Sequence, residues 1–307
     1  MLILNKTTGV FSNLSKGKNY EFLRSFNIQP GKLFLHKLVL GIETSCDDTA
    51  AAVVDETGNV LGEAIHSQTE VHLKTGGIIP PVAQQLHREN IQRIVQEALS
   101  ASKVSPSELS AVATTVKPGL ALSLGVGLSF SLQLVDQLKK PFIPIHHMEA
   151  HALTIRLTNK VEFPFLVLLI SGGHCLLALV RGVSDFLLLG KSLDIAPGDM
   201  LDKRDLLCQS NAVLVVSGGV ASNLYIRKAL EVVTNATQCT LLCPPPRLCT
   251  DNGIMIAWNG VERLHAGLGI LYNTEGIRYE PKCPLGIDIS KEVGEAAIKV
   301  PRLKMKP

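Results

Sequence analysis

Residues 38–66, LVLGIETSCDDTAAAVVDETGNVLGEAIH, contain three short apolar runs, at 38–42, 50–55 and 60–66. Turn-forming residues separate these runs, so each run is predicted to be a β-strand. Because a parallel connection needs a crossover of about a dozen residues or more, the three strands must pair antiparallel. Apolar spacing after this stretch then predicts alternating helices and strands, with helix over 83–99, strand 111–116, helix 120–138, strand 142–145 and helix 147–157.

A second round of the same order begins at residue 165. The predicted elements are strands at 165–170, 175–180 and 186–189, strand 212–216, helix 221–233, strand 240–242 and helix 252–264. Two lobes with three strands followed by a βαβα arrangement describe the actin-like ATPase architecture of the RNase H-like class. We therefore expect an α/β protein with an N-terminal segment at 1–37, a first lobe at 38–160, an incomplete second lobe at 161–285 and a C-terminal tail at 286–307.

The N-terminal segment is basic and rich in hydroxyl groups. Residues 1–40 hold six Lys or Arg residues against one acidic residue, Glu21. This composition is typical of a mitochondrial transit peptide, and a ragged basic tail is the alternative. The remaining chain is slightly acidic, so it offers no general basic field for a nucleic acid, and a polyanion would need a local patch.

The composition favours a folded protein in a reducing compartment. Hydrophobic residues make up 46% of the chain and charged residues 19%, and the seven cysteines are an odd, scattered set. Two apolar runs could suggest membrane spans, but Pro164 and the sequence SGGH interrupt 163–180, and glycines and serines punctuate 119–135. We expect two strands joined by a turn in the first run, a helix packed on a sheet in the second, and no membrane.

The sequence HMEAH at 147–151 suggests half of a metal site. Two histidines four residues apart on a helix present both imidazoles on one face. The alternative is a helix that carries two surface histidines. Asp251, at the start of the predicted helix 252–264, would complete a set of two imidazoles and one carboxylate, although an N-cap is its other interpretation.

Three turns between predicted elements are candidates for ligand contact. They are ETSCDDT at 43–49, LISGG at 169–173 and SGGVASN at 217–223. Paired glycines let the backbone approach an anionic or planar ligand closely, whereas a plain tight turn is the simpler interpretation of each pair. The position of the turns at matching strand ends favours ligand contact.

Five motifs in a fixed order resemble one known family. They are GIETSCDDT at 41–49, HMEAH at 147–151, LISGGH at 169–174, SGGVASN at 217–223 and TDNG at 250–253. From about residue 38 to 285 the chain resembles the tRNA N6-adenosine threonylcarbamoyltransferases, and its N-terminus resembles their mitochondrial branch. The resemblance implies the actin-like fold and transfer of a threonylcarbamoyl group from threonylcarbamoyl-AMP to N6 of the adenosine 3′ of the anticodon in mitochondrial tRNAs that read ANN codons.

The resemblance also implies site residues and partners. His147, His151 and Asp251 would hold one divalent metal ion per subunit, either iron or zinc. The substrate-binding residues that it implies are Leu169, Ile170, Ser171, Gly172, Gly173, Asp202, Ser222, Asn223 and Thr250. Threonylcarbamoyl-AMP and tRNA are the expected partners, and a homodimer is left open.

One departure from the family pattern follows Lys203. The family continues there through a helix, a glycine-rich loop and a helical insert, whereas residues 204–209 here lead directly to the predicted strand 212–216. We therefore expect uncovered strand faces in the second lobe, weak metal binding and no detectable transfer. The alternatives are an inactive isoform that acts as a binding or dimerisation module, and an actin-fold ATPase or kinase, which would hold Mg²⁺ through carboxylates and phosphates.

Overall fold

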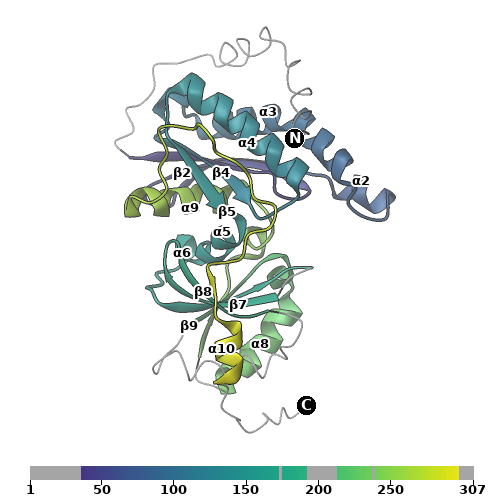
Figure 1. The fold of residues 1–307 in the computed structure, drawn as a ribbon, viewed down its shortest axis with the longest axis vertical. Coiled ribbons are helices and arrows are strands. Elements are labelled where there is room, and N and C mark those ends of the chain that lie inside the picture. The colour runs from purple at the N-terminus through teal and green to yellow at the C-terminus, as the bar shows by residue number, and fades with distance from the viewer. Residues whose placement is uncertain (1–35, 173–174, 192–212, 237–238, 297–307) are drawn as a thin grey trace, which may run out of the picture. The chain divides into compact units, whose positions relative to one another are not determined.

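The computed structural model describes residues 36–172, 175–191, 213–236 and 239–296, and these residues form two mixed β-sheets with helices on their faces (Figure 1). The first sheet has the strand order β3-β2-β1-β4-β5. Its strands are β1 (Leu38–Glu43), β2 (Asp48–Asp55), β3 (Val60–Ser67), β4 (Ala111–Lys117) and β5 (Phe142–His146). The short turns after β1 and β2 force antiparallel pairing, whereas β4 and β5 follow crossover helices and pair parallel.

Helices cover the first sheet on both faces. On one face lie α3 (Pro80–Ser102) and α4 (Ala121–Leu138), and on the other lies α9 (Gly253–Ala266) (Figure 1). The short helix α2 (Thr69–Lys74) and the 3₁₀ turn η1 (Pro106–Glu108) occupy connections. α4 is long and apolar enough to cross a membrane, but it packs against α3 and β4, with Ser131 hydrogen-bonded to Thr114 of β4. It is therefore placed as the core helix of a folded lobe.

The second sheet repeats the topology of the first. Its order is β10-β9-β6-β7-β8-β11, in which β6, β7 and β8 pair antiparallel and β9 and β10 extend the sheet in parallel from β6. The strands are β6 (Phe165–Ile170), β7 (Cys175–Gly182), β8 (Asp185–Lys191), β9 (Val213–Ser217), β10 (Thr240–Leu242) and β11 (Ile287–Asp288). Apart from β11, this is the strand order of the first sheet, so the predicted duplicated α/β class is confirmed.

Both faces of the second sheet are packed. Leu166 and Leu168 of β6 contact a cluster that includes Leu230 of α8 (Leu224–Ala236) and Val293 of α10 (Ser290–Glu295). The alternate residues of β6 face a second cluster built with α5 (His147–Leu153) and α6 (Ile155–Thr158). The expectation of uncovered strand faces is therefore wrong for the described strands, because α8 and α10 cover one face and α5 and α6 cover the other.

The structure differs from the sequence predictions at several elements. The helix predicted at 147–157 is divided at Thr154 into α5 and α6, and the helix predicted at 221–233 becomes a 3₁₀ turn, η2 (Gly219–Ser222), followed by α8. β11 and α10 form in the stretch predicted as a C-terminal tail, where β11 adds to the edge strand β8. The helix α9 was predicted for the second lobe but packs on β1, β2 and β4 of the first sheet.

Candidate metal centre and substrate turns

The two histidines of the predicted site lie at the start of α5, directly after β5. α5 begins at His147, so His147 and His151 are one helical turn apart and project from one face. Their ring centroids are 4.7 Å apart, and the side chains are only 13% and 5% exposed. The alternative of two surface histidines is therefore wrong for this chain.

Asp251 meets both histidines. Its Oδ1 lies 3.3 Å from Nε2 of His147 and 3.0 Å from Nε2 of His151. The N-cap of α9 is the next residue, Asn252, whose side chain accepts a hydrogen bond from the Met255 amide. The capping interpretation of Asp251 is therefore wrong, and its carboxylate is available to the histidines. One ligand atom from each of the three residues lies within 4.8 Å of the others.

The chemistry of this donor set fits a divalent transition metal. Two imidazole nitrogens and one carboxylate oxygen suit zinc or iron and leave coordination positions open for substrate. Burial alone would lower the pKa of His147, but Asp251 and Glu43 hold that pKa well above its usual range. Burial would likewise raise the pKa of Asp251, but His147 and His151 hold it well below its usual range. The surroundings of these side chains therefore favour positive charge at the point where a cation would bind.

Asp251 directly precedes α9, which packs on the first sheet, whereas α5, which carries both histidines, contacts strands of both sheets. Gly41 of β1 and Gly253 at the start of α9 allow very close contact, because a Cβ at Gly41 would lie 2.2 Å from the Ala257 amide nitrogen. This packing places Asp251 beside α5. The expectation that the second lobe supplies Asp251 is therefore corrected, since α9 crosses back to the first sheet.

A buried ion pair joins the two helices that carry the ligands. Nη2 of Arg263 on α9 lies 2.6 Å from Oε2 of Glu149 on α5, and the two side chains are 12% and 10% exposed. Burial raises the pKa of Glu149 even though Arg263 attracts its charged form. Glu149 points away from the histidines, as its position two residues after His147 predicts.

The turn between β1 and β2 is held from two sides. His87 of α3 is fully buried, with Nε2 3.0 Å from the Cys46 carbonyl oxygen and Nδ1 2.7 Å from the Thr49 hydroxyl. On the other side the Ser45 hydroxyl lies 3.1 Å from Nδ1 of His147. The sequence motif predicted this turn as a ligand loop but did not indicate His87, which lies alone on the apolar face of a helix.

The glycine turns of the second lobe lie against each other. β6 and β9 are parallel neighbours, so the turns that follow them meet at one sheet edge. Gly218 adopts φ +94°, and a Cβ there would lie 2.6 Å from the Ile170 carbonyl oxygen. The 3₁₀ turn η3 (Pro246–Leu248), which leads directly into Thr250 and Asp251, contacts η2. The second lobe thus brings its two glycine turns close to the segment that carries the metal ligand.

The other predicted substrate residues have varied surroundings. Leu169 is buried, Ile170 and Ser171 are half-buried, and Gly172 is exposed, whereas Gly173 and Asp202 lie outside the described residues. Three further residues serve local structure in this state: the Ser222 hydroxyl donates to the Gly219 carbonyl, Asn223 accepts from the Tyr225 amide, and the Thr250 carbonyl accepts from Asn252. Thr250 and Asn223 are exposed and accessible to a ligand.

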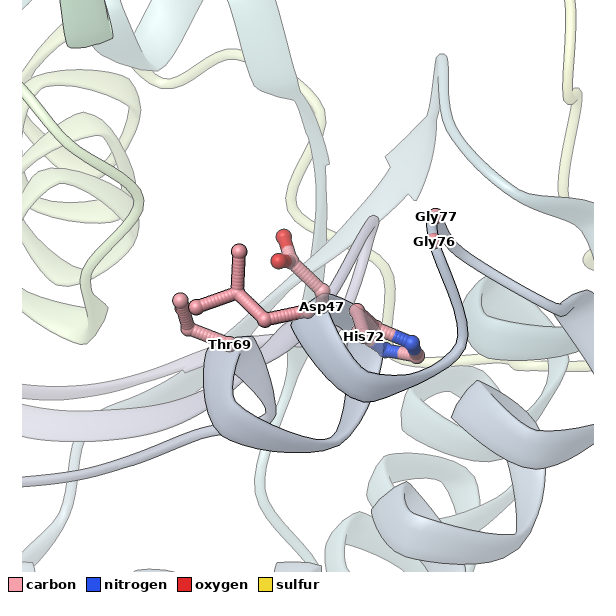
Figure 2. Close-up of a pocket in the computed structure, with 6 residues that line it drawn as sticks. Asp47, Thr69, His72, Gly76 and Gly77 are labelled. Carbon is pink, nitrogen blue, oxygen red and sulfur yellow. The ribbon is translucent and has the colours of Figure 1, made fainter.

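A cavity that the sequence did not predict adjoins the β1–β2 turn. It has a volume of about 470 Å³ and lies between Asp47 and α2, with Thr69, His72, Gly76 and Gly77 in its wall (Figure 2). The Asp47 carboxylate is the only acidic group that lines it, and no Lys or Arg lines it within the described residues. This lining suits a neutral or cationic group better than a phosphate.

Comparisons with known proteins identify the family that the sequence motifs resemble. The profile of the tRNA N6-adenosine threonylcarbamoyltransferase family matches residues 59–211 and 204–258. The chain is 66% identical to the human mitochondrial tRNA N6-adenosine threonylcarbamoyltransferase, in an alignment that covers 99% of this chain and 100% of the human protein. The mitochondrial relative from Danio rerio is 48% identical over 88% of this chain and 93% of its own length. The relative from Rhodospirillum rubrum is 32% identical over 85% of this chain and 98% of its own.

Solved structures with a similar chain path are more distant. YeaZ from Pseudomonas aeruginosa is 12% identical and gives a TM-score of 0.47, with 80% of this chain and 99% of that chain covered. A ROK family glucokinase from Streptomyces griseus, in complex with glucose and AMPPNP, gives the same TM-score at 11% identity, with 74% of this chain and 99% of that chain covered.

The matches also locate the departure from the family pattern. The alignment with the human protein runs over 412 positions, more than the 307 residues of this chain, so it opens gaps in this chain. The two segments matched by the family profile overlap at residues 204–211, where the sequence predicts the missing block. The chain lacks this block but retains the rest of the family pattern. It belongs to the tRNA N6-adenosine threonylcarbamoyltransferase family, in the mitochondrial branch of these tRNA-modifying transferases.

Proposed function

We propose that this chain uses threonylcarbamoyl-AMP as donor and transfers the threonylcarbamoyl group to N6 of the adenosine 3′ of the anticodon in mitochondrial tRNAs that read ANN codons. The observation that carries this proposal is the convergence of His147, His151 and Asp251 beside the glycine turns of the second lobe. An ATPase or sugar kinase would hold Mg²⁺ through carboxylates and phosphates and would not need two buried imidazoles. We place this activity in mitochondria, in line with the names of the relatives and the composition of residues 1–37.

His147, His151 and Asp251 would hold one divalent metal ion, which when bound supplies Lewis-acid activation and a template for the donor's oxygens. The turns at 169–172 and 218–223 would support the donor through backbone N–H groups, and glycine permits the close approach. The acceptor amine of adenine is a weak nucleophile. Its orientation against the donor should therefore supply much of the rate.

The test is a transfer assay with the purified chain, synthetic threonylcarbamoyl-AMP and a mitochondrial tRNA transcript that reads an ANN codon. Mass spectrometry of the digested nucleosides should detect threonylcarbamoyladenosine in this tRNA. A matched transcript with guanosine in place of the acceptor adenosine should give none. Equal signals from the two transcripts would contradict the proposed acceptor.

The missing block favours a second candidate, a chain that binds metal and donor but does not turn over. The specific observation is the two-segment family match, which meets at residues 204–211. The same assay run beside the human relative separates the candidates. A rate within about tenfold of the relative, or 1.4 kcal/mol in the barrier, supports the transferase. A signal no higher than that of the guanosine transcript supports the binding module.

A further inference from the structure

Glu43 is a fully buried carboxylate at the end of β1, and three groups lie within hydrogen-bonding distance of it. Oε1 accepts from the Ser45 amide at 2.5 Å. Oε2 lies 2.5 Å from the Thr115 hydroxyl and 3.2 Å from Nδ1 of His147. An ionised carboxylate accepts at both oxygens and donates at neither, so it matches this environment, whereas an amide or a protonated acid would place a donor against one of these groups.

The contact with Glu43 determines which nitrogen of His147 faces the candidate metal site. If Nδ1 carries the hydrogen that Glu43 accepts, the lone pair of the neutral ring is on Nε2. Nε2 is the nitrogen that faces Asp251, at 3.3 Å. A carboxylate that accepts from the far nitrogen of a ligating histidine fixes both the tautomer and the orientation of the ring.

His151 has no such support. Its Nε2 faces Asp251 in the same way, but its Nδ1 is buried and has no hydrogen-bond partner in the described part of the chain. Within the described residues, a charged group therefore holds the far nitrogen of His147 but not that of His151. The position of His147 depends on the strand β1 and not on α5 alone.

We propose that Glu43 is a positioning residue that fixes the ring and tautomer of His147 for a divalent cation. The inference rests on the proposed metal centre, because His147 is one of its ligands. Glu43 acts on the candidate cation through His147 and is not itself one of the three candidate ligands. Outer-shell partners of this kind typically change metal affinity by about 10- to 100-fold when they are replaced.

The test measures cobalt(II) affinity of the full chain by competition with a chelator, together with the visible absorption of the bound ion, which reports its ligand field. Glu43→Gln keeps the side-chain shape but sets an amide N–H against either Ser45 or His147, so affinity should fall by about 10- to 100-fold. Thr115→Val removes only one donor to Glu43 and should give a smaller loss with an intact fold. Thr49→Val is the matched control, because it breaks the buried contact with His87 in the same turn and leaves Glu43 untouched.

The pattern of results across these variants decides the inference. A selective loss of affinity and a changed cobalt spectrum in Glu43→Gln, with Thr49→Val unchanged, would support it. Equal losses of cobalt affinity in Glu43→Gln and Thr49→Val would overturn it, because they would indicate general destabilisation. An unchanged cobalt spectrum in Glu43→Gln would also overturn it. A wild-type chain that takes up no cobalt would overturn the metal centre itself. If Glu43→Gln fails to fold, an affinity of Thr115→Val equal to that of the wild type would overturn the positioning role.

Discussion

Gly253→Ala should displace the metal ligand Asp251 by crowding the start of α9. A Cβ at Gly253 would lie 2.4 Å from the carbonyl carbon of Ala51 on β2. Carbon atoms in contact prefer a separation of about 3.5–4.0 Å, so the first turn of α9 must move away from the sheet by about 1 Å. Overpacking of this kind costs about 1–3 kcal/mol, against about 0.5–1 kcal/mol gained from alanine in a helix.

The same movement should disturb the metal centre more than it disturbs the fold. Asp251 lies two residues before Gly253, and its Oδ1 is 3.0 Å from Nε2 of His151. A metal site tolerates deviations of only about 0.2 Å in its ligand distances. A shift of about 1 Å should therefore lower metal affinity by at least about tenfold, comparable with the loss of an outer-shell partner.

Chelator competition with cobalt(II) measures this affinity, and two alanine variants serve as controls. Gly260→Ala crowds the same helix near Ala113, but seven residues further from the ligand, and should reduce stability with little effect on affinity. Gly294→Ala on α10 meets no atom within 4 Å and should leave metal affinity unchanged, with a gain in stability of at most about 0.5–1 kcal/mol from alanine in a helix. An unchanged affinity in folded Gly253→Ala would refute the claim that the packing of α9 on the first sheet positions Asp251.

Three further predictions follow from the buried charges and the N-terminal segment. Arg263→Met should leave Glu149 buried and unpaired and lower the free energy of unfolding by about 3–5 kcal/mol, whereas adding Glu149→Leu should recover most of the loss. Urea unfolding followed by the fluorescence of Trp258, the single tryptophan, measures both variants, and an equal loss in the double variant would contradict the prediction. Burial raises the pKa of Asp48 to about 6 from 3.8, so the protonated form that suits the folded protein is lost as the pH rises through 6. Asp48→Asn should therefore have a higher free energy of unfolding than the wild type at pH 8 but not below pH 3.8, and a difference in this free energy that does not change with pH would contradict the prediction. Residues 1–37 fused to a fluorescent protein should enter mitochondria, and a diffuse cytosolic signal would count against the targeting prediction.

The sequence predicts most of the fold because its hydrophobic pattern is strong where the strands are. The short spacing of the runs at 38–42, 50–55 and 60–66 permits only an antiparallel meander, and the structure has one there. The repeat of that pattern after residue 165 predicts the second sheet with the same strand order. Helical spacing likewise predicts that His147 and His151 share a face.

The position of α9 could not be predicted in this way. An apolar helix that follows β10 in the sequence is equally suited to either sheet by its periodicity. The close approach at Gly41 and Gly253 decides between them, and that contact joins residues far apart in the chain. β11 and α10 were missed for a related reason, because a two-residue strand has almost no pattern of its own and forms by pairing with β8.

The surroundings of the candidate site could not be predicted from the sequence either. In the sequence Glu43 is a polar residue at the end of a predicted strand, yet it is fully buried and lies within hydrogen-bonding distance of three groups. An ionisable residue within an apolar strand is the signal that could have indicated it. His87 gives a weaker signal, since a histidine on an apolar helix face is common in cores without a functional role.

Metal stoichiometry of the purified chain shows whether His147, His151 and Asp251 form a metal site. His147 and His151 on α5 and Asp251 before α9 all lie outside the missing block after Lys203, and α9 packs on the first sheet, so the absence of the block should not prevent metal binding. After reconstitution with zinc or iron and removal of excess metal, elemental analysis should find one ion per wild-type chain and none in the His147→Ala/His151→Ala double variant. A metal-free wild-type chain, or a double variant that keeps stoichiometric metal, would show that these three residues do not form a metal site.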